Sequence, residues 1–259
     1  MRKLLLLLGM SLCLMSVYAQ KPMPRVAMFG QIDAHMFNAP FRIYAPDGTR
    51  LETKRMHSGF NWLKTILGKE ELMYGNCPQP SLGFFMTIPM IPVAFKASCA
   101  YERLAFKMTY PGEANSCVHI ANGIKPEFDL YYTMGGPNNI VKPAFFLGGA
   151  YHCPLSFIKG NSEADVAMLN KGFEIVGGFS FLIIPGFQGT YYEEGLTVTS
   201  SSKNLYIEVG LEYRYALYNY FNQDFTKGTS MPYSGYTSKY GEICLGLTMG
   251  GFFSTRHQR

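Results

Sequence analysis

The chain has 259 residues, of which 15% are aromatic and 16% are charged, and its formal net charge is +5. Its basic residues are scattered and two of them lie in an N-terminal leader, so the charge argues against a nucleic-acid-binding protein. No run of about 18 apolar residues follows the leader, and a protein that crosses a membrane with helices is therefore not expected.

Residues 1–19 have the pattern of a secretory signal peptide. Two basic residues precede the apolar run 4–8, and Val17-Tyr18-Ala19 places small residues at the −3 and −1 positions of a cleavage site. Cys13 is a poor candidate for lipid attachment, because a leucine precedes it where a small residue is required. The mature chain is expected to start near Gln20 and to be exported.

The segment 20–80 is interpreted as an N-terminal extension. Residues 25–33 and 41–45 have the composition of short strands, and Pro46-Asp47-Gly48 marks a turn between such elements. Apolar residues at helical spacing predict a short amphipathic helix within 58–73.

The region 81–253 is interpreted as a β-barrel, and 254–259 as a C-terminal tail. Apolar and polar side chains alternate through the region, which is the pattern of strands with two unlike faces. The predicted strands are 81–90, 93–109, 125–134, 142–157, 172–184, 187–198, 205–221 and 240–253. Glycine pairs that begin at Gly148, Gly177 and Gly250 indicate bends or close approach between strands.

The segment 205–221 shows the alternation most clearly. Its odd-numbered positions are almost all apolar, whereas Glu208, Glu212 and Arg214 lie on the other face. Several predicted strands are longer than the roughly five or six residues usual in soluble proteins, and long enough to cross a bilayer at a tilt. We therefore predict an all-β fold, an antiparallel up-and-down transmembrane β-barrel of about eight strands whose lumen is filled by side chains.

Two other interpretations stay open. A soluble periplasmic β-domain that binds an apolar ligand or a partner protein would show the same alternation, with its apolar face as the core. A lipid-modifying barrel enzyme would need a nucleophile near a histidine and a carboxylate, for which Ser180, His152 and Glu174 are the candidates. Hydrogen-bonded filling of the lumen explains these three residues more simply, so no catalytic residue and no enzyme activity is predicted.

The predicted connections leave the strand count open between eight and ten. Tight reversals are predicted at 90–92, 135–139 and 185–186, and longer loops at 110–124, 158–171 and 222–240. Short turns of outer-membrane barrels face the periplasm, and on this rule eight strands from residue 81 would end on the outer side. Adding 25–33 makes the count odd, and adding 41–45 as well makes ten. Ser162-Glu163-Ala164-Asp165 resembles the start of a short helix.

Charged side chains inside a narrow barrel should be paired, because an unpaired buried charge is costly. The candidate cations are Lys96 and Arg214, and their candidate partners are Glu102, Glu174, Glu208 and Glu212. Aromatic residues near strand ends suit a girdle at the membrane surface, with core packing as the alternative. These residues are Tyr215, Tyr218, Tyr220, Tyr240, Phe252 and Phe253.

Cysteine and histidine spacing predicts neither a metal nor a cofactor. The five cysteines after the leader form no CxxC motif, although an oxidising compartment would allow a disulfide between Cys77 and Cys117. The histidines outside the predicted strands, which show no ligand spacing, are His35, His57, His119 and His257. Nucleotide-binding glycine motifs are absent from the sequence.

Three motifs between residues 81 and 198 are similar to those of one known family. Gly83-Phe84-Phe85 opens a short-turned hairpin, 145–151 forms a glycine-containing strand, and Tyr191 leads into Gly195-Leu196-Thr197. On these residues the chain resembles the PorT-like outer-membrane β-barrel family of Bacteroidota. The resemblance implies a protein surrounded by lipid in the bacterial outer membrane, associated in some members with type IX secretion or other envelope proteins. It implies no functional residues.

Overall fold

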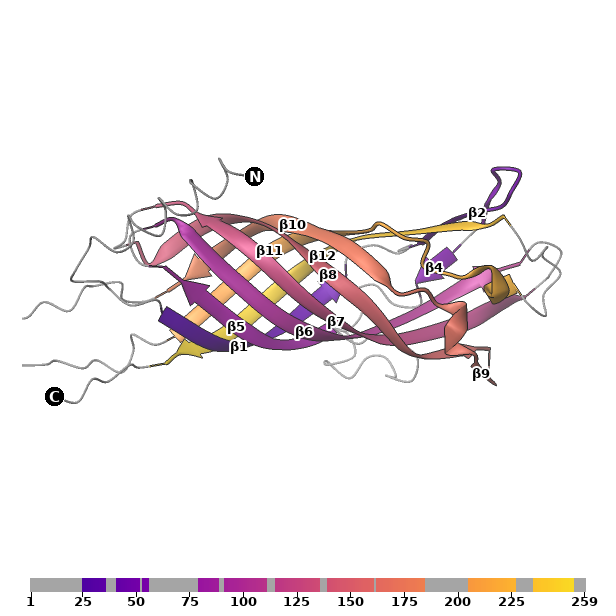
Figure 1. Ribbon diagram of the computed structural model, residues 1–259, viewed down its shortest axis with the longest axis horizontal. Helices are drawn as coiled ribbons and strands as arrows, with labels where there is room; N and C mark the ends of the chain where they lie inside the picture. Colours follow the sequence, from indigo (N-terminus) through magenta and orange to yellow (C-terminus); the bar gives the residue numbers. More distant parts are fainter. Residues whose placement is uncertain are drawn as a thin grey trace, which may run out of the picture.

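Eight antiparallel strands close into a ring in a computed structural model of the chain (Figure 1). The structure describes residues 25–35, 41–51, 53–55, 79–88, 91–110, 115–135, 139–160, 162–184, 205–226 and 235–253. The ring strands, in order, are β1 (Arg25–His35), β5 (Gln79–Thr87), β6 (Val93–Thr109), β7 (Ser116–Thr133), β8 (Val141–Lys159), β10 (Gly172–Ile183), β11 (Leu205–Ala216) and β12 (Thr237–Phe252). Each strand pairs with the next, and β12 pairs back with β1, which closes an up-and-down barrel.

The predicted all-β barrel of about eight strands is confirmed, but the eight strands are not the predicted ones. The segment 25–33, considered above as an additional strand, lies in β1 and completes the ring between β5 and β12. The barrel therefore includes residues before 81. The predicted strand 187–198 lies outside the described residues, as do the leader, the predicted helix 58–73 and the reversal at 185–186.

Including β1 in the ring keeps the number of ring strands even. Arg25 at the start of β1 lies opposite Thr87, and Phe252 at the end of β12 lies opposite Ala27. Both ends of the described chain thus lie at one end of the barrel, together with the short connections after Thr87 and Thr133 (Figure 1, left). We call this the turn end, and the opposite end the loop end.

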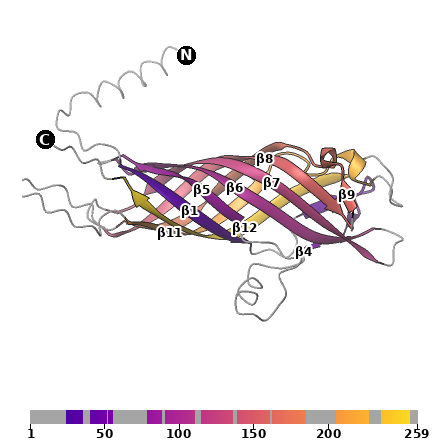
Figure 2. The same ribbon diagram turned by 90° about the horizontal axis from the view of Figure 1, so that it is seen from below.

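The wall extends further at the loop end, where short strands flank the long ring strands (Figure 2). β2 (Phe41–Tyr44) pairs with β12 and with β3 (Arg50–Leu51), β4 (Thr53–Arg55) pairs with β6, and β9 (Ser162–Ala164) pairs with β8. The predicted strand 41–45 is therefore real, but it extends the wall beside β12 and is not a ninth or tenth ring strand.

Three boundaries predicted at the loop end were wrong. β7 begins at Ser116, so 116–124 is strand and not loop, and β11 ends at Ala216, after which the chain leaves the wall. The predicted helix start at Ser162 is strand β9; Asp165 instead caps the single-turn helix η2 (Val166–Met168), its Oδ1 accepting a hydrogen bond from the Ala167 amide at 2.9 Å. A second such turn is η4 (Gln223–Thr226), and no helix among the described residues is long and apolar enough to cross a bilayer.

The predicted close approach at the glycine pairs is confirmed. A Cβ atom on Gly178 would overlap the carbonyl oxygen of Leu211, and a Cβ atom on Gly250 would overlap that of Met28. Any side chain at these positions would push neighbouring strands apart. The glycines therefore allow the tight coiling of the wall that a small barrel requires.

Candidate functional site

The outer surface of the barrel carries a continuous belt without a charged side chain. On every ring strand the outward-facing residues are apolar, glycine or uncharged over nine to thirteen positions, and many are exposed, as at Leu82 (73%) and Leu147 (65%). These stretches, which we call the outer belt, are 26–34, 80–88, 93–101, 124–132, 141–153, 173–183, 205–215 and 241–251. At about 3.3 Å per residue and a tilt near 45°, nine to eleven residues rise roughly 21 to 26 Å.

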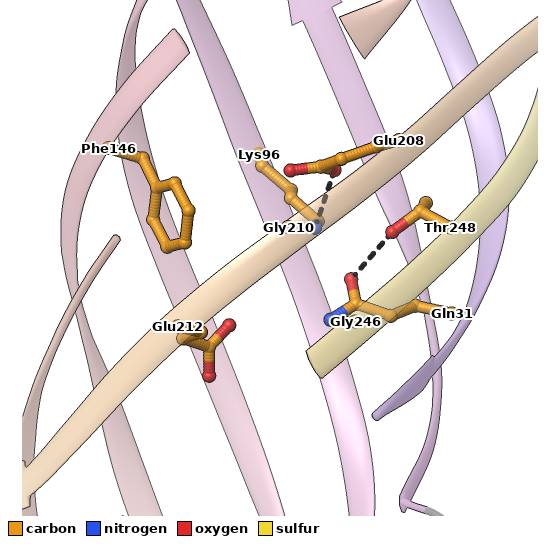
Figure 3. A pocket seen from close by; sticks show the side chains of 8 residues that line it. All are labelled: Gln31, Lys96, Phe146, Glu208, Gly210, Glu212, Gly246 and Thr248. Carbon is orange, nitrogen blue, oxygen red and sulfur yellow. Dashed lines mark hydrogen bonds and ion pairs between the residues drawn. The ribbon is translucent and has the colours of Figure 1, made fainter. Parts of the chain in front are cut away.

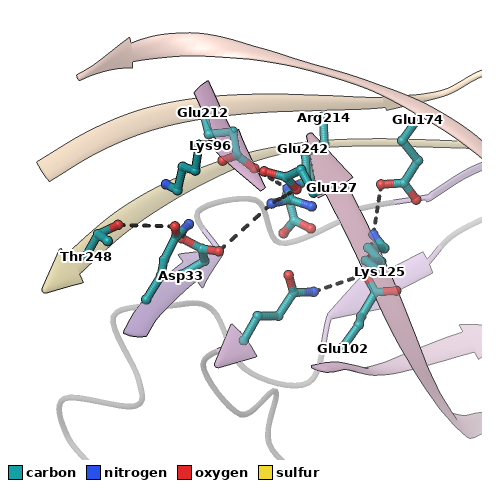
Figure 4. Close-up of polar contacts among 12 residues, drawn as sticks. Asp33, Lys96, Glu102, Lys125, Glu127, Glu174, Glu212, Arg214, Glu242 and Thr248 are labelled. Atoms are coloured by element: carbon teal, nitrogen blue, oxygen red, sulfur yellow. Dashed lines mark hydrogen bonds and ion pairs between the residues drawn. The ribbon is translucent and has the colours of Figure 1, made fainter. Parts of the chain in front are cut away.

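The lumen holds the charges that the outer belt lacks (Figure 4). Eight carboxyl side chains are buried there against four cationic ones. The acids are Asp33, Glu102, Glu127, Asp129, Glu174, Glu208, Glu212 and Glu242, and the cations are Lys96, Lys125, Lys142 and Arg214. Because the acids outnumber the cations, hydroxyl and amide groups must supply the remaining hydrogen bonds.

Both carboxylate oxygens of Glu208 on β11 have hydrogen-bond donors. Its Oε2 lies 3.0 Å from the Lys96 ammonium and accepts a hydrogen bond from the Tyr206 hydroxyl at 2.5 Å. Its Oε1 accepts one from the Tyr131 hydroxyl at 2.8 Å. The predicted pairing of Lys96 with one of the glutamates is thus confirmed, with Glu208 as the partner. By contrast, Oδ1 of Asp129 has no hydrogen-bond partner within the described part of the chain.

Lys125 is a further buried cation of the lumen and was not among the predicted ones. Its ammonium lies 2.7 Å from Glu102 Oε1 and 2.9 Å from Glu174 Oε2, and so bridges two carboxylates that had been assigned to other partners. Glu102 also accepts a hydrogen bond from the Gln79 amide at 3.0 Å. The sequence did contain this information, because Lys125 is separated from Glu127 and Asp129 by an even number of residues and must therefore share their inward face.

Arg214 lies among three acidic side chains. It is paired with Glu212, as predicted, and its Nη2 lies 2.8 Å from Glu127 and 3.9 Å from Asp33. Asp33 also accepts a hydrogen bond from the Gln31 amide at 2.7 Å. The acids come from β1, β7 and β11, so the guanidinium joins strands on opposite sides of the lumen.

The structure does not bring the candidate catalytic residues together. His152 lies opposite Gly172 and Ser180 lies opposite Ala144, so eight residues, or about 26 Å of strand, separate the two levels. His152 Nδ1 instead lies 3.0 Å from Glu102 Oε2, and its ring contacts that of Tyr220. Among the described residues no group of three histidine, cysteine or acidic side chains is placed to hold a metal ion.

Apolar clusters bracket the lumen charges on both sides. Near the turn end the rings of Phe85 and Tyr206 stack at 4.5 Å within a cluster that includes Phe146. Near the loop end Phe41 contacts Phe106 at 4.9 Å and Tyr220 at 4.7 Å. Residues of the β1–β5 connection thus fill the mouth of the barrel, and the charges lie in an enclosed layer.

A small cavity of about 10 Å³ lies between the charged layer and the turn-end cluster (Figure 3). Its lining residues are Gln31, Lys96, Phe146, Glu208, Gly210, Glu212, Gly246 and Thr248. The Thr248 hydroxyl donates a hydrogen bond to Gln31 Oε1 at 3.1 Å across one wall. A space of this size accommodates about one water molecule, so it is too small for an organic ligand.

Of the six aromatic residues predicted for a girdle, two are exposed, three are buried, and Tyr218 is partly buried against the loop-end cluster. Tyr215 and Phe253 are exposed on the outer wall, whereas Tyr220, Tyr240 and Phe252 are buried inside the barrel. Core packing was thus the right interpretation for those three. The exposed tyrosines at the loop-end edge of the outer belt are Tyr101, Tyr213 and Tyr215.

Of the cysteines, Cys99 is exposed and Cys244 is buried. Cys77 lies outside the described residues, so a disulfide between Cys77 and Cys117 stays a prediction.

A comparison with protein-family models finds no match to this chain, and a comparison with curated proteins finds none either.

Proposed function

We propose that this protein is an integral β-barrel of the bacterial outer membrane, with a structural or envelope-associated role and no enzymatic activity. The observation that supports this proposal is the distribution of charge between the two faces of the wall. A soluble β-domain places its apolar side chains inside and its charges in water. Here the charges lie inside, and an uncharged belt about as tall as the apolar band of outer-membrane barrels faces outward.

The same distribution argues against the alternative of a soluble periplasmic domain that binds an apolar ligand. Such a domain would need an apolar cavity in its interior, whereas the cavity near the lumen charges is lined mostly by polar residues and is only water-sized. It would also expose side chains such as Leu147 and Phe173, each 65% accessible, to water on all sides.

The filled lumen favours a structural, adhesive or secretion-associated role over transport. The resemblance to PorT-like barrels supports an association with envelope or secretion proteins, and membrane lipid is the expected immediate partner. The expected location is the outer membrane, and the signal peptide would direct the export of the chain. No arrangement of the described side chains favours the lipid-modifying alternative, since Ser180 and His152 lie at different levels of the barrel.

Fractionation of cells that produce the full chain tests the proposal. We expect the protein in the outer-membrane fraction, resistant to extraction by carbonate, and migrating faster on a gel before boiling than after it because the folded barrel stays compact. Recovery in the soluble periplasmic extract would overturn the proposal and restore the soluble alternative.

A further inference from the structure

Two basic residues face each other on the outer wall just beyond the outer belt. Arg42 on β2 is the direct partner of Lys239 on β12, and both point away from the lumen, Arg42 exposed and Lys239 partly exposed. Direct cross-strand partners lie about 4.5 to 5.5 Å apart at their Cα atoms, and like charges in such a position destabilise the pairing.

The buried neighbours of Arg42 hold its backbone in place, so Arg42 and Lys239 cannot move apart. Phe41 and Ile43, on either side of Arg42, are completely buried in the loop-end cluster. The ring of Phe41 contacts Tyr220 at 4.7 Å and Tyr240 at 5.5 Å, and Tyr240 adjoins Lys239. Any turn of β2 that moved Arg42 away from Lys239 would pull these rings out of the cluster.

No described carboxylate neutralises the pair. Neither Arg42 nor Lys239 forms an ion pair in the part of the chain that the structure describes. Asp47, in the turn that follows β2, instead accepts a hydrogen bond from the Thr49 amide at 2.8 Å. Arg103 on β6 is a third outward cation at the edge of the belt, and it too has no ion-pair partner among the described residues.

The cations lie at the height expected of lipid head groups. Lys239 is two residues beyond the belt on β12, and Arg103 is two residues beyond it on β6, where Tyr101 forms the edge. Two residues of a tilted strand rise about 5 Å. A bilayer's polar regions add roughly 5 to 7 Å on each side of its hydrocarbon core.

We propose that Arg42 and Lys239 form a binding site for the phosphate group of an anionic membrane lipid at the loop end. Arginine matches phosphate oxygens with two parallel hydrogen bonds, and lysine adds a compact charge. A phosphate between Arg42 and Lys239 would turn their repulsion into a shared attraction. This inference rests on the proposed insertion into a membrane.

The test uses the full mature chain in nanodiscs that contain phosphatidylcholine mixed with phosphatidic acid. The double variant R42Q/K239Q removes the facing charges. The matched control R50Q/K107Q removes two exposed cations further from the belt, and R42K keeps the charge. Native mass spectrometry counts the phosphatidic acid that stays bound to each barrel after release from the disc, and gel migration before and after boiling reports insertion.

Binding by the proposed surface predicts enrichment of phosphatidic acid on the wild type and a loss of roughly tenfold in R42Q/K239Q. R42K, which keeps the charge but not the two parallel hydrogen bonds, should show a smaller loss, and R50Q/K107Q little change. The enrichment should also weaken with added salt. Equal enrichment in wild type and R42Q/K239Q, or none in a wild type that inserts normally, would overturn this inference and leave the membrane proposal standing. A wild type that fails to insert into any disc would instead contradict the proposed function itself.

Discussion

The ammonium of Lys96 and the carboxylate of Glu208 meet at 3.0 Å inside the barrel, although 112 residues separate them in the chain. Lys96 lies on β6 and Glu208 on β11, so the contact crosses the lumen. Both side chains are almost completely buried, and each is therefore costly to leave alone. The two side chains consequently form a buried ion pair that links β6 to β11 across the lumen.

Removing one partner of this buried ion pair should destabilise the barrel strongly. We expect Lys96→Met alone to reduce the free energy of unfolding by about 3 to 5 kcal/mol, because Glu208 stays buried without a counter-charge. The double variant Lys96→Met/Glu208→Leu should lose much less than the sum of the two single losses. Urea unfolding in lipid vesicles measures all three variants, and strictly additive losses would show that the two groups do not interact.

Asp129→Asn should have the opposite effect from changes at Glu208. The Oδ1 atom of Asp129 has no hydrogen-bond partner among the described residues, and the lumen contains more acids than cations. An uncharged isostere relieves the repulsion from Glu127 and Glu212, and its amide can still donate a hydrogen bond to Glu127, so we expect a gain of about 1 kcal/mol in unfolding free energy. Glu208→Gln, which disturbs three donors, is the matched control and should destabilise. A marked loss in Asp129→Asn would indicate a partner that holds its charge.

Alternation predicted the direction of most side chains correctly, but it left open whether 25–33, now part of β1, belongs to the ring. The reason is physical: at the turn end both faces of the wall are apolar. Ala27 and Phe29 enter the turn-end cluster while Met28 faces outward, so the sequence there loses the contrast that marks a two-faced strand. The segment 205–221 kept that contrast because its inward residues include Glu208, Glu212 and Arg214.

The lumen charges were partly predictable for a related reason. Parity places Lys96, Glu208 and Arg214 on the inner face, but which cation meets which acid depends on how the strands are staggered around the ring. Sequence spacing carries no information on that stagger. Glu102 and Glu174 therefore received no correct partner until the structure placed Lys125 between them.

A charge placed in the middle of the outer belt should weaken insertion. Leu147 lies at the centre of the belt on β8 and is 65% exposed, so Leu147→Arg should cost about 2 to 4 kcal/mol in a bilayer. Leu155 lies on the same strand beyond the belt, and Leu155→Arg should cost less than about 1 kcal/mol. The fraction folded into vesicles measures both, and equal effects at the two positions would contradict the assignment of the belt.

The enclosed lumen should not conduct ions. Aromatic clusters fill the barrel on both sides of the charged layer, with Phe85 and Tyr206 stacked on one side and Phe41 against Tyr220 on the other. We expect no stepwise current from the wild type in planar bilayers. Shortening Phe41 and Tyr220 to alanine should loosen the loop-end cluster without opening the turn-end one. Stable unit conductance in the wild type would show that a path through these clusters exists.

His119, on β7 beyond the outer belt, should make the loop end sensitive to acid. Its Nε2 lies 2.8 Å from the Tyr110 hydroxyl, its Nδ1 lies 3.1 Å from the Cys117 carbonyl oxygen, and its ring stacks on Phe106. This arrangement suits the neutral ring, with Nδ1 donating and Nε2 accepting. Burial lowers the pKa of His119 from its ordinary value of 6.5 to about 4.

The sign of the pH effect follows from that lowered pKa. Between about pH 6.5 and 4 the unfolded segment binds a proton at this position that the folded one does not, so stability is complete above this window and falls as the pH decreases through it. The total loss in the free energy of unfolding is about 3 kcal/mol at acid pH. Hydrogen exchange of the loop-end backbone, compared between wild type and His119→Phe, measures it. His119→Phe keeps the stacking and removes the titration, so its exchange should vary less with pH; the same pH dependence in both proteins would exclude His119 as the cause.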